Sequence, residues 1–295
     1  MKIRSLANTY IIKTLILSSV LLALGACSQK SSESSKALDD SIAAKNTEYL
    51  TRDIKDDIFY FVMPDRFHNA DPSNDNGDPN RPISFGGLDK TSKWAFHGGD
   101  IQGIEAKLDY IQDMGVTAIW MTPLLRNRAV QSDGFGHHGY WVIDFTEIDP
   151  HFGSNQDLRS LIDAAHARGM KVFFDIITNH TADVIKYKEC HKLDGTFIKD
   201  EPGCQYKSTE QLQSGDVYTP FVLDAEKAVK FPEWLNDPKY YNNQGDSYWQ
   251  GESVVNGDFA GLDDLNTSNP DVVEGMTEIF KNIIDEFKPD GFRID

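Results

Sequence analysis

Cysteine is scarce in this chain, which has three cysteines among its 295 residues. No Cys-x-x-Cys spacing occurs, and the pair Cys190 and Cys204 has one histidine, His191, close by, which disfavours a zinc site. In an exported protein such a pair is typical of one disulfide that closes a surface loop, while two free thiols are the alternative.

Basic residues are in the minority, because 29 Lys and Arg stand against 46 Asp and Glu, for a formal net charge of −17. Such a surface repels phosphate backbones, so we expect no nucleic-acid partner. Neither GxGxxG nor GxxxxGKS/T follows a predicted strand, which weakens a nucleotide-binding function. The acidity suits neutral or cationic ligands, calcium among them, although it also serves solubility alone.

No apolar run is long enough for a comfortable membrane span, but the N-terminus has the pattern of an export signal. A basic start precedes the apolar stretch TLILSSVLLAL, and Leu-Gly-Ala-Cys follows, ending at Cys27. This ending resembles a bacterial lipobox, in which the cysteine is lipidated and becomes the new N-terminus. Ordinary cleavage beside an incidental cysteine is the alternative.

The lipobox reading predicts a signal peptide at 1–27 and an exported bacterial lipoprotein of the cell envelope. Its lipid would attach it to the outer membrane or cell surface, with the periplasm as a further location. Residues 28–52 are rich in Ser, Lys, Asp and Ala and poor in large apolar groups, which predicts a flexible tether. We expect structure to begin near Asp56.

Beyond the tether, short apolar runs alternate with segments of helical periodicity. The predicted strands are 57–63, 116–122, 171–177 and 291–295, and the predicted helices are 100–114, 155–168 and a segment capped by Asn269-Pro270. This alternation indicates an α/β fold with a parallel sheet of buried strands. A doubly wound sheet and a (β/α)₈ barrel share the pattern, so periodicity leaves both open.

Apolar residues at helical spacing predict the face that each helix buries. The expected inward side chains are Ile101, Ile104, Leu108, Ile111 and Met114, then Leu158, Leu161, Ile162 and Ala165, then Val273, Met276, Ile279, Phe280, Ile283, Ile284 and Phe287. Between the third strand and the third helix lie roughly 90 residues, too many for a simple loop. They predict a small inserted domain at 181–260, between barrel or sheet segments 53–180 and 261–295.

One loop after the first strand, HNADPSNDNGD, is dense in side-chain oxygen atoms. Its candidate ligands are Asn69, Asp71, Asn74 and Asp75, and oxygen at this density suits a hard cation such as Ca²⁺. The loop is not an EF-hand, because neither the glycine nor the terminal glutamate is in register. A plain Asx-turn loop is the alternative.

Four segments at predicted strand ends, GYW (139–141), DIITNH (175–180), GLDDL (261–265) and GFRID (291–295), occur in the order seen in the alpha-amylase family of glycoside hydrolases. Together with IEAKLDYIQDMGVTAIWMTP they resemble that family over about residues 55–295. The resemblance implies a (β/α)₈ TIM barrel with a domain inserted after strand three. Four strands would be the first half of that barrel.

The same resemblance assigns roles at the strand ends. Asp295 matches the catalytic nucleophile, and Arg293, two residues earlier on one face of the strand, would keep it ionised and oriented. His180 matches a histidine that hydrogen-bonds the sugar, and Tyr140 an aromatic ring that stacks on it. The other expected substrate-site residues are His138, as a second sugar contact, and Asp175, as a support residue.

The family likeness also extends the calcium predictions. A carbonyl at Gly98 and a carboxylate at Asp100 would complete the first site. Asn179 and Asp264 match a second site, although this chain has Leu-Asp-Asp-Leu where Leu-Pro-Asp-Leu is common. Aromatic residues of the insertion could form outer sugar subsites or a small core, and we favour the core for Trp234, Tyr240, Tyr241 and Trp249.

The resemblance therefore predicts a retaining hydrolase of alpha-linked glucans such as starch and maltooligosaccharides, with Ca²⁺ as cofactor. A transglycosylase of the glucanotransferase kind and a non-catalytic glucan-binding lipoprotein are the alternatives. In the family the general acid is a glutamate at the end of strand five. We expect residues 28–295 to be part of a longer enzyme and to be inactive and poorly stable alone.

Overall fold

The computed structural model describes residues 48–131, 134–198 and 203–295, so Cys27 and the predicted signal peptide lie outside the described residues. The chain divides into two units, Met1–Arg52 and Asp53–Asp295. In the first unit, Glu48–Thr51 form the short helix α2, which corrects the expectation that structure begins near Asp56. Among the described helices, none combines the length and apolarity that crossing a membrane requires.

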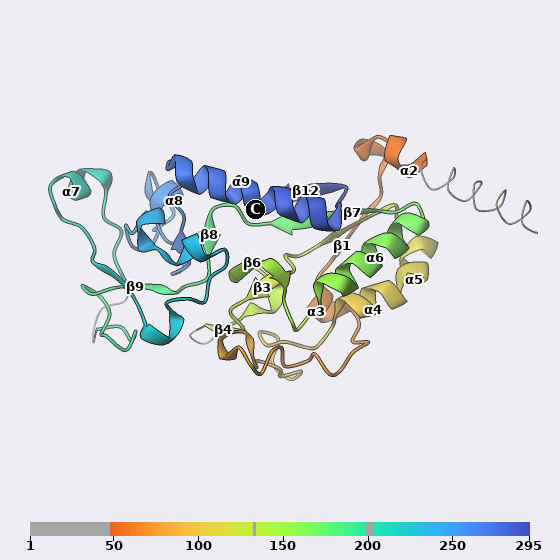
Figure 1. Ribbon diagram of the computed structural model, residues 1–295, viewed down its shortest axis with the longest axis horizontal. Helices are drawn as coiled ribbons and strands as arrows, with labels where there is room; N and C mark the ends of the chain where they lie inside the picture. The colour runs from red at the N-terminus through yellow and green to blue at the C-terminus, as the bar shows by residue number, and fades with distance from the viewer. Residues whose placement is uncertain (1–47, 132–133, 199–202) are drawn as a thin grey trace, which may run out of the picture. The chain divides into compact units, whose positions relative to one another are not determined.

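Four parallel strands form the central sheet of the second unit (Figure 1). In spatial order they are β1 (Phe59–Val62), β2 (Ala118–Met121), β7 (Lys171–Ile176) and β12 (Gly291–Ile294). Each strand pairs with the next one along the chain among these four, whereas a doubly wound sheet reverses its order at a switch point. The prediction of an α/β fold with a parallel sheet is confirmed.

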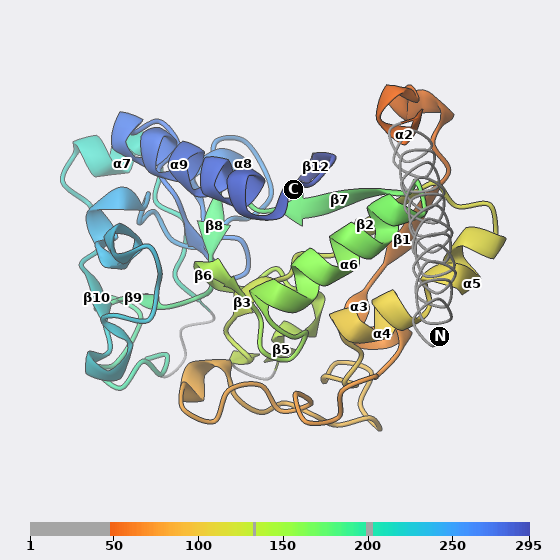
Figure 2. The same cartoon turned by 45° about the vertical axis from the view of Figure 1, so that its right-hand side comes forward.

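The main helices line up along one face of this sheet (Figure 2). They are α4 (Ile101–Ala106), α5 (Leu108–Asp113), α6 (Asn155–Ala167) and α9 (Pro270–Phe287). Helix α6 contacts both α4 and α9, so the layer is continuous. Sequential parallel strands with helices on one side have the arrangement of a barrel wall.

Two helical predictions need correction. Segment 100–114 is two helices, because Lys107 has φ −111° and ψ 11°, outside the helical region. The helical periodicity restarts at Lys107, so Met114 no longer lies on the buried stripe and is 45% exposed. In α9 the buried stripe begins at Val272 instead of Val273, which is 51% exposed, and Ile284 is 45% exposed.

The shifted stripe of α9 leaves an apolar groove of about 450 Å³ beside β12. Val273 and Ile284 border it together with Phe292 and Ile294. The N-terminus of α9 follows the prediction, because the side chain of Asn269 accepts a hydrogen bond from the Asp271 N–H. The predicted inward residues of α6 are also buried.

The other face of the sheet carries aromatic rings and the polar residues of the strand ends. Phe59 contacts Phe173 with ring centroids 4.9 Å apart, and Phe61 contacts Trp120 at 4.5 Å. Phe59 and Phe61 are 41% and 49% exposed, so the prediction of a buried first strand is wrong. In the described sheet β1 is an edge strand, with a neighbouring strand on one side only.

The segment between β7 and α9 begins and ends at one two-stranded pair. Strand β8 (His180–Thr181) pairs with β11 (Asp263–Asp264), and β9 (Ile185–Tyr187) pairs with β10 (Pro220–Val222). A disulfide joins Cys190 to Cys204 inside this segment. Because Asp53–Asp295 form one unit, a separate inserted domain stays a prediction.

The remaining described elements are short. They are α3 (Pro64–Phe67), β3 (Leu125–Asn127), β4 (Val130–Gln131), β5 (Gly134–Phe135), β6 (Val142–Ile148), α7 (Thr209–Gln213), α8 (Ser253–Asn256) and six 3₁₀ turns. Strand β6 pairs with β3 beside the GYW segment.

Candidate active site

The carboxylate of Asp175, near the C-terminal end of β7, is the centre of a hydrogen-bonded cluster. Its Oδ1 accepts a hydrogen bond from Arg293 Nη1 at 3.0 Å. Its Oδ2 accepts from Tyr140 Oη at 3.0 Å and from Trp120 Nε1 at 3.2 Å. Burial raises the pKa of Asp175, and the hydrogen bonds from Arg293 and Tyr140 oppose that rise. Because both of its oxygens accept hydrogen bonds, Asp175 holds the side chains of Arg293, Tyr140 and Trp120 in position.

Strand register brings the two acidic residues to one arginine. Arg293 is the direct partner of Asp175 across β7 and β12. Asp295 lies two residues further, on the same face, and its Oδ1 accepts from Arg293 Nη1 at 2.5 Å. The Asp295 side chain is 30% exposed, so this carboxylate is charge-paired and still open to a ligand.

Tyr140 is presented by a tight turn. Gly139 has φ 87°, and a Cβ there would collide with the carbonyl of Pro123, so a side chain is excluded. The Tyr140 N–H donates to His138 Nδ1 at 3.0 Å, and His180 Nε2 lies 3.1 Å from the Tyr140 carbonyl. His180 Nδ1 is buried without a hydrogen-bond partner among the described residues. A ligand hydroxyl would satisfy it.

Burial disfavours the protonated form of the histidines at and beside this cluster. Burial lowers the pKa of His138 to about 4, and burial likewise lowers the pKa of His137 to about 4. The pKa of His180 is also lowered by burial. Burial and the neighbouring Asp175 carboxylate raise the pKa of Tyr140. These groups therefore suit a polar uncharged ligand better than an anion.

Trp120 is the member of this cluster that sequence reasoning missed. It lies in the apolar run of β2, and such a position predicts a core residue. Besides its bond to Asp175, its ring lies 5.8 Å from the guanidinium carbon of Arg293. The register across β2 and β7 places it here, because Trp120 pairs with Phe173, which shares the face of Asp175, and the sequence alone gives no signal for that register.

Four of the predicted calcium ligands lie together after β1. Asn69 Nδ2 donates to Asp75 Oδ1 at 2.5 Å, and a Cβ on Gly98 would collide with both side chains. Asn69 Oδ1 and both polar atoms of the Asn74 side chain are buried without a partner among the described residues. Orphaned buried oxygens from this set fit a Ca²⁺ ion.

Two further predicted ligands are occupied by the backbone. Asp71 Oδ1 accepts from the Ser73 N–H at 3.0 Å, which is the Asx-turn alternative. Asp100 Oδ1 accepts from the Gly103 N–H at 2.6 Å and caps α4, and its Oδ2 accepts from the N–H groups of Ala70 and Asp71. Asp100 thus ties the loop to the helix in this structure.

The second predicted calcium pair lies where β8 meets β11. The backbone carbonyl of Asn179 accepts from the Leu265 N–H at 2.7 Å, while its side chain is exposed. Asp264 is buried, and burial raises its pKa to about 7, although Asn242 Nδ2 donates to it at 2.6 Å. A cation would offset the cost of burying this carboxylate.

The additional aspartate of the Leu-Asp-Asp-Leu segment has a structural partner. Asp263 and Lys230 are both buried, with Lys230 Nζ 2.5 Å from Asp263 Oδ2 and 3.0 Å from Tyr241 Oη. Asp263 therefore links two parts of the segment that are far apart in the sequence. Its carboxylate already has Lys230 as an ionic partner, without a metal ion.

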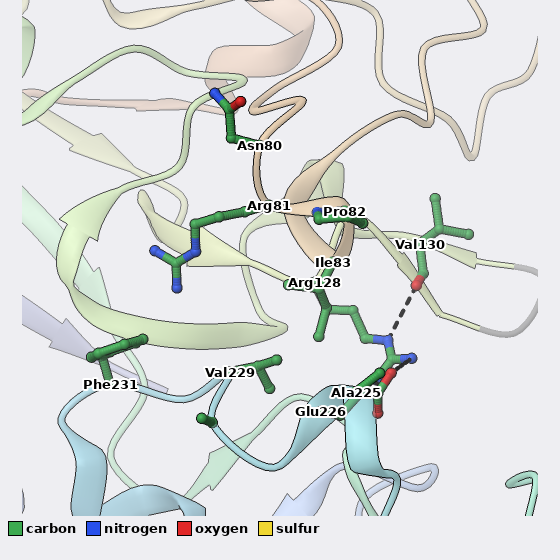
Figure 3. Close-up of a pocket in the computed structure, with 11 residues that line it drawn as sticks. Asn80, Arg81, Pro82, Ile83, Arg128, Val130, Ala225, Glu226, Val229 and Phe231 are labelled. Atoms are coloured by element: carbon green, nitrogen blue, oxygen red, sulfur yellow. Dashed lines mark hydrogen bonds and ion pairs between the residues drawn. The ribbon is translucent and has the colours of Figure 1, made fainter.

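A separate pocket of about 620 Å³ contains none of the predicted site residues (Figure 3). Its two arginines are already engaged. Arg128 forms a two-pronged pair with Glu226 at 2.7 and 3.1 Å, and the Arg81 guanidinium lies 5.2 Å from the Phe231 ring centre. The Asp175 cluster, with its open carboxylate and orphaned histidine nitrogen, remains the better candidate site.

Comparison with known proteins gives one consistent match. The family model described as the alpha amylase catalytic domain matches residues 61–295. The chain is 50% identical over 227 residues to an alpha-amylase from Streptomyces lividans, which is 71% of this chain and 25% of that protein. The chain thus spans about a quarter of that relative's length.

Solved structures agree with the family model. An alpha-amylase from Geobacillus thermoleovorans, complexed with acarbose, shares 31% identity at a TM-score of 0.53, covering 83% of this chain and 41% of that one. CldA, a cyclomaltodextrin glucanotransferase, shares 28% identity at a TM-score of 0.60, covering 81% of this chain and 44% of that one. The sheet therefore corresponds to part of a TIM-barrel catalytic domain.

Proposed function

The chain belongs to the alpha-amylase family of glycoside hydrolases, and on that premise we propose that it carries the nucleophile side of a retaining site for alpha-linked glucans. The observation that carries the proposal is the Arg293 bridge between the buried Asp175 and the accessible Asp295. A retaining glycosidase needs an ionised carboxylate aimed at the anomeric carbon. Arg293 and its partners hold one in place.

In the proposed reaction, Asp295 Oδ forms a bond to the anomeric carbon as the glycosidic C–O bond breaks. The leaving oxygen takes a proton from a general acid, whose carboxyl group stands about 5–5.5 Å from the nucleophile in retaining enzymes. Water then attacks the ester, gives its proton back to that acid, and releases the sugar with its original configuration. Asp175 already accepts hydrogen bonds from Trp120, Tyr140 and Arg293, so we assign it a supporting role and not that of the acid.

We propose that the acid comes from a fifth barrel strand in the intact enzyme, so residues 28–295 alone are inactive. Around the nucleophile, the Tyr140 ring and the free Nδ1 of His180 would contact the sugar in the cleaved subsite. Neutral His138 would add a hydrogen bond without an ionic charge. These contacts match an uncharged polyhydroxylated substrate.

Calcium would act here as a structural cofactor. Asn69, Asn74, Asp75 and the Gly98 carbonyl would hold one ion, which would satisfy the orphaned oxygen atoms and fasten the loop after β1. Asn179 and Asp264 would contribute to a second. Asp71 and Asp100 would join the first site through oxygens that also accept backbone hydrogen bonds.

The test uses the intact enzyme on starch, pullulan and cyclodextrins, with and without a chelator. We expect proton NMR of the first products to show the alpha anomer, and Asp295→Asn to abolish turnover. Asp113→Asn, an exposed carboxylate on α5, is the matched control and should retain full activity. Beta-configured products, or an active Asp295→Asn enzyme, would contradict the proposal.

A glucanotransferase is the second candidate. It is favoured by the calcium loop and by the structural likeness to CldA. Cyclised or elongated products from starch at low water activity would support it over hydrolysis. A non-catalytic glucan binder is the third, and intact glucan binding without turnover by the full-length protein would establish it.

We further propose attachment to the cell envelope through lipid on Cys27. The support is the apolar stretch followed by Leu-Gly-Ala-Cys in the sequence. Metabolic labelling with a fatty acid should mark the protein, and Cys27→Ser should release it from the membrane fraction. An unlabelled wild-type protein would contradict the anchor.

A further inference from the structure

A histidine lies against both sulfur atoms of the disulfide in the segment between β8 and β11. His191 Nδ1 is 3.5 Å from Cys190 Sγ and 3.6 Å from Cys204 Sγ. All three side chains are buried. Among the described residues they form the one group of three His, Cys or acidic side chains whose ligand atoms all lie within 4.8 Å of one another. The sequence disfavours zinc because no Cys-x-x-Cys spacing occurs, but the fold brings these three residues together.

The turn after β9 fixes the positions of Cys190 and His191. The N–H groups of these two residues donate to the Tyr187 carbonyl, at 3.2 and 2.8 Å. The Ile198 N–H donates to the Cys190 carbonyl at 2.9 Å, and the Phe197 ring stacks on the imidazole with centroids 4.4 Å apart. None of these contacts involves a sulfur atom, so we expect them to survive cleavage of the disulfide.

The Nδ1 atom of His191 carries the free electron pair that a metal ion needs. The Tyr187 N–H donates to Nδ1 at 3.3 Å, so this nitrogen is the acceptor of the neutral ring. The contact is longer than the usual range of about 2.7–3.2 Å, which makes it a weak competitor for the electron pair. Nδ1 is also the ring nitrogen that lies against the two sulfurs.

The distances between nitrogen and sulfur match those around a tetrahedral zinc ion. With Zn–S bonds of about 2.3 Å and a Zn–N bond of about 2.0–2.1 Å, tetrahedral angles place sulfur and nitrogen about 3.6 Å apart. The separations in this structure are 3.5 and 3.6 Å. The two sulfurs themselves would stand about 3.8 Å apart, a distance that becomes available once the bond between them is broken. His191 is therefore already placed for an ion that the disulfide excludes.

Charge and access also suit a thiophilic dication. Two thiolates neutralise Zn²⁺ and the neutral imidazole adds no charge, so the complex can remain buried, whereas Ca²⁺ prefers oxygen ligands. Cys204 lines a cavity of about 380 Å³ together with Asp246 and Tyr248. This cavity gives a reductant and an ion a route to the Cys204 side of the disulfide.

We propose that reduction of the disulfide creates a zinc site formed by Cys190 Sγ, Cys204 Sγ and His191 Nδ1. A dithiol reductant gives two electrons and two protons to the disulfide and itself becomes a disulfide. Zn²⁺ then displaces the two thiol protons and binds the two thiolates and the imidazole, with water in the fourth position. The ion would replace the disulfide as the cross-link of this segment in reducing surroundings.

The test uses the full-length protein with Cys27→Ser, so that this third cysteine takes no part, and with excess Ca²⁺ to occupy oxygen-rich sites. One sample keeps its disulfide, and the other is reduced with a dithiol that is then removed under nitrogen. Competition with a chromogenic chelator measures the affinity for Zn²⁺. Co²⁺ in place of zinc reports thiolate ligation through its charge-transfer absorption in the near ultraviolet.

Three variants separate ligation from packing. His191→Phe keeps a ring beside Phe197 but has no ligand atom, and Cys204→Ser removes one thiolate. His68→Gln, at an exposed position, is the matched control. Near-UV circular dichroism confirms that each variant is folded before zinc is added.

We expect the reduced parent to bind one more Zn²⁺ per chain than the oxidised parent, with thiolate-to-cobalt absorption. Because outer-shell partners alone can contribute 10–100-fold to metal affinity, loss of the ligand itself in His191→Phe should weaken zinc binding by about 100-fold or more. Cys204→Ser should lose the site as well, and His68→Gln should bind like the parent. Equal zinc binding by the oxidised and reduced parent, or by the reduced parent and His191→Phe, would overturn the proposal and leave His191 as a packing residue.

Thermal denaturation tests the role of the ion as a cross-link. Reduction should lower the Tm of the parent, and Zn²⁺ should restore most of that loss in the parent but none of it in His191→Phe. A reduced parent whose Tm does not respond to Zn²⁺ would refute the replacement of the disulfide by the ion.

Discussion

The cluster around Asp175 and the loop after β1 are both polar and partly buried, but they satisfy their polar atoms differently. Asp175 receives three hydrogen bonds from side chains on neighbouring strands and the Tyr140 turn. In the loop, Asn69 and Asn74 keep buried polar atoms without partners among the described residues. One region is organised by the protein alone, and the other keeps buried polar atoms that the proposed calcium ion would satisfy.

This difference separates positioning from ligation. A buried carboxylate that accepts several hydrogen bonds holds its neighbours in one geometry before substrate arrives. A loop with unfilled buried oxygens pays for desolvation until a cation binds. Mutations should therefore affect catalysis in the first region and calcium-dependent stability in the second.

The largest effect should follow Arg293→Lys in the intact enzyme. A single ammonium cannot reproduce the planar guanidinium that joins Asp175 to Asp295, so we expect kcat to fall on the order of 10²–10³-fold with little change in KM. Arg159→Lys, at a surface pair with Glu286, is the control and should keep wild-type kinetics. A rise in KM alone would show that Arg293 binds substrate and does not orient the nucleophile.

Calcium should raise the thermal stability of the wild-type enzyme and leave the stability of the Asp75→Ala variant nearly unchanged. At a hundred times its dissociation constant a ligand adds about 2.7 kcal/mol to the free energy of unfolding. Thermal denaturation with calcium and with chelator measures the gain, and Asp89→Asn, in an exposed turn, is the control. Equal gains in wild type and Asp75→Ala would place the ion elsewhere.

When calcium is removed by a chelator, loss of a polar side chain should change the free energy of unfolding in opposite directions in the two regions. Asn74→Ala removes unpartnered buried atoms, so the free energy of unfolding should stay constant or rise. Trp120→Phe removes one donor to a buried carboxylate and should lower it by about 1.5–3 kcal/mol. Urea denaturation measures both. Destabilisation by Asn74→Ala without calcium would mean that the loop satisfies itself, against the comparison drawn above.

The last effect concerns the dependence of stability on pH. His138 stays neutral in the fold because burial lowers its pKa to about 4 from the ordinary value of 6.5. The unfolded chain therefore takes up the proton first as the solution is acidified. The stability from neutral His138 is fully present above pH 6.5 and is lost as the pH falls towards 4. His138→Gln should flatten that loss in urea titrations, while His68→Gln, at an exposed site, should leave it unchanged.

Strands and helices were predictable where periodicity was strong. Strand alternation predicted that Arg293 and Asp295 share a face, and the family resemblance added Asp175, whose pairing with Arg293 depends on the register of β7 and β12. Trp120 was missed because a ring within an apolar strand reads as core until the register across β2 and β7 is known.

Exposure was harder to predict than element type. Val273 and Ile284 fit a helical stripe in sequence, but which of two adjacent stripes packs inward depends on the neighbouring layer. Trp249 was expected in the core of the insertion, but it is 58% exposed, and its left-handed backbone was not predicted from the sequence. Asn74 and Asp100 were both predicted as calcium ligands, but they have different surroundings. Backbone N–H groups donate to the Asp100 carboxylate, whereas the Asn74 side-chain amide has no hydrogen-bond partner among the described residues.

The most direct test of the account is to trap the glycosyl-enzyme on the intact protein with an activated glucosyl fluoride slowed by a second fluorine on the sugar. Fluoride leaves without a proton, so trapping depends on the nucleophile and little on the general acid. Peptide mass spectrometry should find one monofluorinated hexosyl adduct on Asp295, absent in Asp295→Asn. An adduct on any other carboxylate, or none from an enzyme that still hydrolyses starch, would contradict Asp295 as the nucleophile.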